Sequence, residues 1–133
     1  MSLQAPLSQY EQVSIQEAVN GASPHRLIQM LMEGALKRMA EAKGAMQRRD
    51  TAAKGAALGK SISIIGGLRD SLNMDTPGGL SQRLDGLYEY MVSVLVRANV
   101  NDDPMAIDEV AQLMITVKSG WDKIAEEAGS QAG

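Results

Sequence analysis

The single histidine of the chain is the first residue to examine for chemistry, because imidazole is the side chain that exchanges protons most readily near neutral pH. His25 directly follows Pro24 in the stretch SPHRLIQ. Acid–base catalysis by one histidine needs a carboxylate to orient it and a nucleophile beside it, and the sequence specifies neither. We therefore predict a surface histidine in the first turn of a helix and no catalytic residue.

Histidine phosphotransfer is the alternative that a lone histidine in a helical chain raises. Phosphotransfer bundles carry their histidine in the middle of a helix, on an exposed face, followed by a lysine and a glycine that leave room for the phosphate. Here Arg26 and Leu27 follow His25, close to the start of a helix. The pattern favours the surface interpretation over phosphotransfer.

Metal and cofactor sites find no support in the sequence. Di-iron bundles need Glu-x-x-His pairs that face inward, and no glutamate lies three residues before His25. The run Asn101, Asp102 and Asp103 resembles the start of a calcium loop, but it lacks the required glycine and terminal glutamate. It is typical of a turn with a helix cap. We expect no metal, no cofactor and no enzyme activity.

The overall composition indicates a single cytosolic domain. A chain of 133 residues is long enough to bury a core, and the absence of cysteine excludes disulfides and thiolate metal sites. No apolar run reaches the roughly 18 residues that span a bilayer, and the N-terminal residues lack the pattern of a secretion signal. The net charge is −3, and the basic residues are scattered, which argues against nucleic-acid binding.

Proline placement organises the chain into helices. Pro24, Pro77 and Pro104 each follow a Ser, Thr or Asp, and such a cap before an initial proline is a strong start signal. Asp50 is a further cap candidate. The predicted helices run over about 24–48, 52–74, 77–99 and 104–127. Because short connections make consecutive helices antiparallel neighbours, we predict an all-α, antiparallel up-down four-helix bundle over 23–127. Residues 1–22 are predicted to form an N-terminal arm or short extra helix, and 128–133 a flexible tail.

The second predicted helix is unusually rich in small residues. Gly55, Gly59, Gly66 and Gly67 share one side of it with alanine and serine, although glycine disfavours a helix interior. Two interpretations stay open. Either a neighbouring helix or a ligand chain approaches the backbone closely there, or the helix is irregular and breaks at Gly66–Gly67.

The predicted helices carry more apolar residues than one core stripe needs. In the third helix the stripe at helical spacing comprises Leu80, Leu84, Leu87, Met91, Val94, Leu95 and Ala98. A second line of Tyr88, Val92 and Val96 ends beside Asn99, and Met32, Leu36, Ile64 and Leu68 form similar flanks on the first two helices. These flanks indicate a wide core, a homodimer interface, or an exposed groove for a partner's helix or extended chain. Nine methionines and no phenylalanine suit an adaptable binding surface.

Three segments together resemble a known family. SPHRLIQMLMEGALKRMAEA, LDGLYEYMVSVLVRAN and the tryptophan of WDKI resemble the flagellar secretion chaperones of the FliS family, over a region from Tyr10 to Trp121. One departure is Met32, which stands where family members often have an aromatic residue. The resemblance implies a helical bundle that binds the disordered C-terminal segment of flagellin in the cytosol. It also implies that the complex prevents early polymerisation and presents flagellin to the export gate.

The resemblance also suggests where the partner binds. In the family the N-terminal arm can lie over part of the binding surface, and Tyr10 matches the tyrosine of that arm. The second line of the third helix, which is Tyr88, Val92 and Val96 with Asn99, would then be the wall of a groove rather than core. The residues predicted to bind the partner are Tyr10, Val13, Met32, Leu36, Ile64, Leu68, Tyr88, Val92, Val96 and Asn99.

Overall fold

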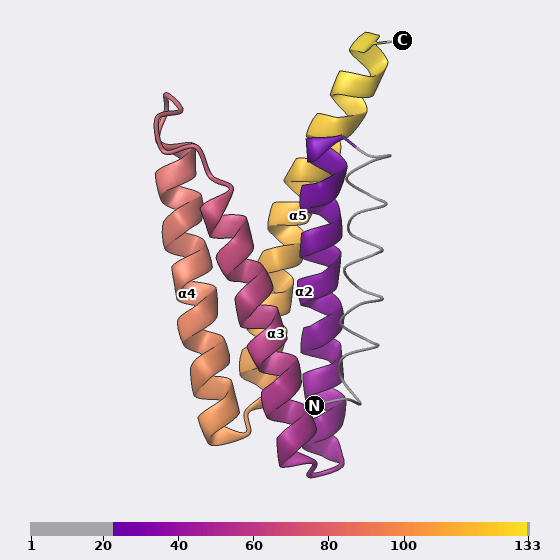
Figure 1. Cartoon of the computed structure of the whole chain (residues 1–133), viewed down its shortest axis with the longest axis vertical. Coiled ribbons are helices and arrows are strands. Elements are labelled where there is room, and N and C mark those ends of the chain that lie inside the picture. The colour runs from indigo at the N-terminus through magenta and orange to yellow at the C-terminus, as the bar shows by residue number, and fades with distance from the viewer. Residues whose placement is uncertain (1–22, 133) are drawn as a thin grey trace, which may run out of the picture.

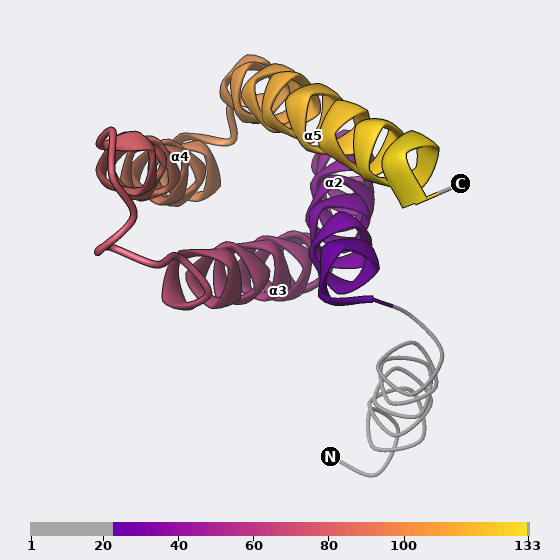
Figure 2. The same cartoon turned by 90° about the horizontal axis from the view of Figure 1, so that it is seen from above.

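The computed structural model describes the backbone of residues 23–132 and the side chains of residues 23–124. This part of the chain consists of four helices and contains no strand. They are α2 (Pro24–Gln47), α3 (Thr51–Asp70), α4 (Leu80–Asn101) and α5 (Pro104–Ala132). Consecutive helices run antiparallel, and α5 returns to pack against α2, which closes a ring of four (Figures 1 and 2). The predicted all-α up-down bundle is confirmed. The predicted arm lies outside the described residues.

Three of the predicted helix starts are confirmed at their caps. Side-chain oxygens of Ser23, Asp50 and Asp103 each accept a hydrogen bond from the backbone N–H three residues further on, at 3.2, 3.1 and 3.3 Å. Each cap satisfies one of the N–H groups that the first turn of a helix leaves without a partner. Helix α5 continues to Ala132, past the predicted end at residue 127.

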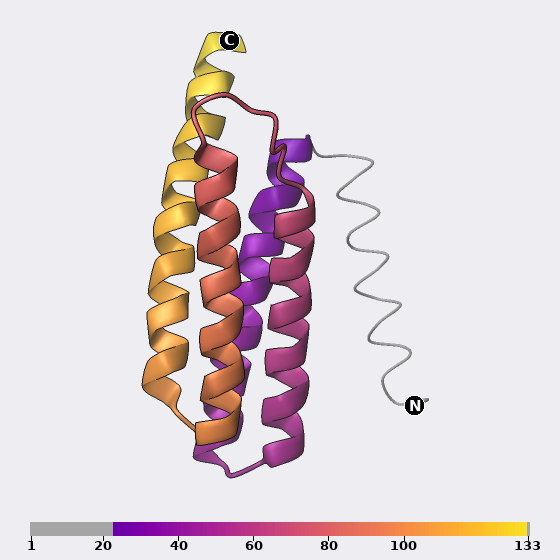
Figure 3. The same ribbon diagram turned by 90° about the vertical axis from the view of Figure 1, so that its left-hand side faces the viewer.

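The predicted start of the third helix at Pro77 is wrong. Gly78 and Gly79 have φ angles of 95° and 72°, which lie in the left-handed region that glycine adopts without a steric penalty. A helix cannot pass through these angles, so α4 begins only at Leu80. Since α3 ends at Asp70 rather than near residue 74, a long loop over 71–79 joins the two helices at one end of the bundle (Figure 3).

Helices α2 and α3 make the most extensive contact in the bundle because the residues between them are small. Ala35, Ala42 and Ala57 are buried there, and the Ser61 hydroxyl donates a hydrogen bond to the Ala35 carbonyl at 3.2 Å. A hydroxyl on so short a side chain reaches the next helix's backbone only where the two helices approach closely. Helix α5 then packs against α2, and helix α4 packs against α3.

The four glycines of α3 do not take part in that contact. A Cβ atom added at Gly55, Gly59, Gly66 or Gly67 would meet nothing within 4 Å. Among the described residues, therefore, no neighbouring helix approaches them. The alternative of a break at Gly66–Gly67 is wrong as well, because α3 is continuous from Thr51 to Asp70. Approach by a partner chain stays a prediction.

The core is wider than the predicted stripes. Met91, Val94 and Leu95 are fully buried as predicted, whereas Leu80, placed in the same stripe, is 52% exposed. Three residues predicted to lie outside the core are buried, and these are Met32, Leu68 and Tyr88. The reason is the ring of helices: each helix packs against two neighbours, so residues at the edge of its apolar arc are also covered. No helix over 23–132 is long and apolar enough to cross a membrane.

Candidate functional site: an apolar cavity at one end of the bundle

An open cavity of about 570 Å³ lies where α2 and α4 begin and α3 ends. Figure 2 looks down onto this end of the bundle. All four helices and the 71–79 loop contribute to the lining, and none of the lining residues is an Asp, Glu, Lys or Arg. They are Pro24, His25, Leu27, Ile28, Met32, Leu68, Ser71, Leu72, Asn73, Thr76, Leu80, Ser81, Leu84, Tyr88, Val117 and Trp121. A hollow of this composition favours an apolar segment as its occupant.

Buried residues of three helices contribute to the inner wall of the cavity. Met32 of α2, Leu68 of α3 and Tyr88 of α4 line it and are at most 2% exposed. Burial raises the pKa of the Tyr88 phenol, so this side chain stays neutral at all physiological pH values. The three residues belong at once to the core and to the wall of the cavity. Although these residues are buried, they therefore remain part of the candidate site.

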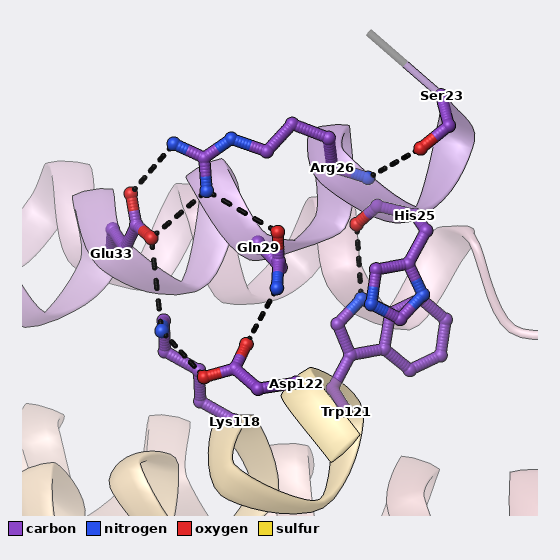
Figure 4. A network of polar contacts seen from close by, with 8 residues as sticks. All are labelled: Ser23, His25, Arg26, Gln29, Glu33, Lys118, Trp121 and Asp122. Carbon is purple, nitrogen blue, oxygen red and sulfur yellow. Dashed lines mark hydrogen bonds and ion pairs between the residues drawn. The ribbon is translucent and has the colours of Figure 1, made fainter. Parts of the chain in front are cut away.

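His25 and Trp121 form one side of the cavity as a stacked pair. Their rings lie 4.3 Å apart between centroids and are nearly parallel, with an interplanar angle of 6°. The indole Nε1 donates a hydrogen bond to the His25 carbonyl at 3.0 Å, which ties α5 to the first turn of α2 (Figure 4). The predicted position of the histidine in the first turn of a helix is confirmed, but its ring is partly buried, because Trp121 on the facing helix covers one face of it.

A polar network fastens α2 to α5 beside that stacked pair (Figure 4). The Gln29 amide donates to one oxygen of Asp122 at 2.7 Å, and the Lys118 ammonium donates to the other at 2.9 Å. These two donors hold the pKa of the Asp122 carboxyl below its usual range, and the hydrogen bond from Lys118 is the larger cause. Glu33 accepts from Arg26 at 3.1 Å and lies 3.7 Å from Lys118.

On the other side of the cavity, an ion pair joins α3 to α4. The Arg69 guanidinium of α3 donates to Asp85 of α4 at 2.9 Å from Nε and at 3.3 Å from a terminal nitrogen. This two-point hydrogen bond holds the pKa of the Asp85 carboxyl below its usual range. Asp85 and Asp122 therefore hold the helices around the cavity in place as long as both are ionised.

The two depressed carboxyl pKa values predict how acid affects stability. A carboxyl whose pKa is lower in the folded protein stabilises it above the unfolded pKa of roughly 4, and this contribution is lost as the pH falls through the folded pKa. We expect the melting temperature to fall below about pH 4. In the Asp85→Asn/Asp122→Asn double variant the fall should be shallower. Thermal melts across the acid range test this, and identical slopes in both proteins would contradict it.

Comparison with known proteins shows to which family the chain belongs. Residues 6–128 match the family model described as "Flagellar protein FliS". The chain is 52% identical over 119 residues to "Flagellar secretion chaperone FliSB" of Pseudomonas aeruginosa, a match that covers 90% of this chain and 94% of that protein. The chain belongs to the FliS family. It is also 40% identical to "Flagellar secretion chaperone FliS" of Salmonella typhimurium, over 92% of this chain and 91% of the relative. Its identity to the protein of the same name from Bacillus subtilis is 33%, over 91% and 86%.

This FliS-family chain brings only some of the predicted partner-binding residues together. Met32, Leu68 and Tyr88 all line the cavity. Leu36 of α2 instead lines a separate hollow of about 510 Å³, together with Ile115 of α5. Ile64 lies between α3 and α2, with its Cδ1 atom 3.5 Å from where a Cβ at Gly34 would stand. Tyr10 and Val13 lie outside the described residues.

Val92, Val96 and Asn99 share the side of α4 that faces α3. Residues seven apart lie on one side of a helix, and Val92 is seven residues from both Asp85 and Asn99. Asp85 contacts α3 through Arg69, and the Asn99 carbonyl accepts from the Lys54 ammonium of α3 at 2.9 Å. Val92 is partly buried and packs against the core, whereas Val96 is 49% exposed. Of these two valines, Val96 is therefore the one that exposes much of its apolar surface.

Sequence reasoning named Met32, Leu68 and Tyr88 as partner-binding residues, but it did not predict the cavity, because it placed Leu80 and Leu84 of the same lining in a core stripe. Leu27, Leu72 and Leu84 have ordinary helical spacing, which does not show whether a neighbouring helix covers them. The sequence signal closest to the cavity is the segment over 71–79 with its two adjacent glycines, which forms the loop between α3 and α4 and contributes to the lining.

Proposed function

We propose that this chain is a cytosolic export chaperone that binds the C-terminal segment of flagellin. Binding would prevent premature polymerisation of flagellin and help deliver it to the flagellar export gate. The observation that carries the proposal is the apolar cavity, free of Asp, Glu, Lys and Arg, in a chain of the FliS family. The relatives' name, flagellar secretion chaperone, supports an export role.

The cavity suits a client segment that is disordered when free. Such a segment loses conformational entropy when it binds, so it needs a large apolar area to bind tightly. The cavity supplies a site for its bulkiest apolar side chains, and Met32 in the wall adapts to different shapes. From there the segment would continue over Val96 and the small-residue side of α3, where Gly59 leaves room for its backbone.

We propose that residues 1–22 cover part of the cavity when no client is bound. They directly precede Ser23, and the next two residues, Pro24 and His25, already line the cavity. We propose that Tyr10 and Val13 occupy part of the apolar surface until the client displaces them. Few contacts would be lost in that exchange, so release of the arm opposes client binding only weakly.

Calorimetric titration of the full chain with the C-terminal segment of flagellin tests the proposal. We expect saturable binding with a negative heat-capacity change, because apolar surface becomes buried. A scrambled segment of the same composition is the control and should not bind. If neither peptide binds and the chain sediments as a dimer, the apolar surfaces form a homodimer and the chaperone proposal fails.

A further inference from the structure

One buried polar atom in the bundle has no partner. Among the described residues, His25 Nε2 is the only buried side-chain nitrogen or oxygen without a hydrogen bond. Nearly all buried polar groups in folded proteins are paired, because an unpaired one has lost its bonds to water and gained nothing. His25 Nε2 is therefore a group with one unused hydrogen bond to offer.

The surroundings of His25 show where such a partner would come from. One face of the ring is covered by Trp121, and the ring belongs to the lining of the apolar cavity. A half-turn about the Cβ–Cγ bond keeps the stack on Trp121 and exchanges the two edges of the ring. Such a turn would move Nε2 out of its buried position and leave the stacked pair intact, and it is the movement by which Nε2 would reach an occupant of the cavity.

The lining also restricts the chemistry of that partner. None of the residues around the cavity is an Asp, Glu, Lys or Arg, so a charged group entering it would lose its hydration without a countercharge. A hydroxyl or amide side chain loses much less and can form a hydrogen bond with an imidazole nitrogen. The matching occupant is an apolar segment that carries one neutral hydrogen-bonding side chain.

We propose that His25 is the residue that sets the register of the client in the cavity, through a hydrogen bond from its Nε2 to a hydroxyl or amide side chain of the bound segment. This inference rests on the proposed chaperone function. It makes His25 a specificity residue, since an apolar segment without the polar side chain would leave Nε2 unpaired. The stack on Trp121 then serves to hold the imidazole at the right place.

Two variants of the full chain separate the hydrogen bond from the stack. His25→Phe keeps an aromatic ring on Trp121 and removes the nitrogen, whereas His25→Gln keeps a hydrogen-bonding group and removes the ring. Titrated with the C-terminal segment of flagellin, His25→Phe should bind about five- to tenfold more weakly than the wild type. His25→Gln should retain more of the affinity. Because the unpaired nitrogen is gone, His25→Phe should melt at the same temperature as the wild type or higher.

If His25 were purely structural, its replacement would not weaken client binding while leaving the melting temperature unchanged or higher. Affinity of His25→Phe equal to that of the wild type would overturn the inference and leave the chaperone proposal standing. So would a loss of affinity in His25→Gln alone, because the stack would then be what matters. Absence of binding by the wild type would instead refute the proposed function itself.

The partner atom can be identified from the client's side. Each Ser, Thr, Asn and Gln of the flagellin segment is replaced by alanine in turn and titrated against both proteins. One replacement should weaken binding to the wild type by the factor seen for His25→Phe and leave binding to His25→Phe unchanged. If every replacement weakens binding to the two proteins equally, no side chain of the segment bonds to Nε2, and the inference is wrong.

Discussion

Met91→Asp is expected to unfold the bundle. Met91 is completely buried at the centre of α4, and its neighbours in the core are apolar side chains from the other helices. The substitution removes a long apolar side chain and places a carboxylate where nothing pairs with it. A loss of more than about 4 kcal/mol is a large share of the 5–15 kcal/mol that stabilises a typical domain. Circular dichroism at 25 °C should show that most of the helical signal is lost.

Two control variants show that this effect comes from burial of charge. Met91→Leu keeps the volume and apolar character of the site and should cost less than about 1.5 kcal/mol. Val96→Asp places the same carboxylate on the same helix, but at a residue that is 49% exposed, and should leave the melt nearly unchanged. A folded Met91→Asp protein with a melting temperature near that of Val96→Asp would show that α4 is packed differently.

The fold class could be predicted from the sequence because its signals are local. The caps at Ser23, Asp50 and Asp103 depend on residues within one turn of the chain, and each is present in the structure. The cap predicted at Thr76 failed for an equally local reason. Two glycines with positive φ follow Pro77, and the preference of glycine for these angles competes with the preference of proline for a helix start.

The division between core and surface could be predicted only in part. Helical spacing shows which direction a residue faces, but the width of the buried arc depends on how many neighbours a helix has and how they cross it. Tyr88 points toward the edge of the apolar arc of α4 and is buried. Leu80 points toward the centre of that arc, yet it is 52% exposed. Leu80 escapes burial because it is the first residue of α4, next to the loop that opens the end of the bundle.

The cavity and the His25–Trp121 pair could not be predicted from the sequence for a similar reason. The two residues are 96 positions apart, and their contact depends on the antiparallel packing of the first helix against the last. No spacing rule within one helix reports such a contact. Once the helices are placed, the stack on Trp121 explains why His25 is partly buried at this end of the bundle.

Leu80→Asp should weaken binding of the flagellin segment by roughly 10- to 100-fold while leaving the bundle folded. Leu80 is more than half exposed in the free protein, so a carboxylate there keeps most of its hydration and costs little stability. The same side chain lines the cavity, and a client that fills the cavity would strip water from the carboxylate without providing a countercharge. The penalty therefore appears only in the complex. Titration with the segment and thermal melts measure the two effects separately.

Met105→Asp is the matched control for Leu80→Asp. Met105 is 77% exposed and lies at the start of α5, at the opposite end of the bundle from the cavity. Both substitutions exchange an exposed apolar residue near a helix start for the same charge, so both should leave the melting temperature nearly unchanged. Only Leu80→Asp should weaken client binding, because only Leu80 belongs to the cavity. Equal losses of affinity in the two variants would place the client on a surface other than the cavity, and unaltered affinity in Leu80→Asp would exclude the cavity as the client's site.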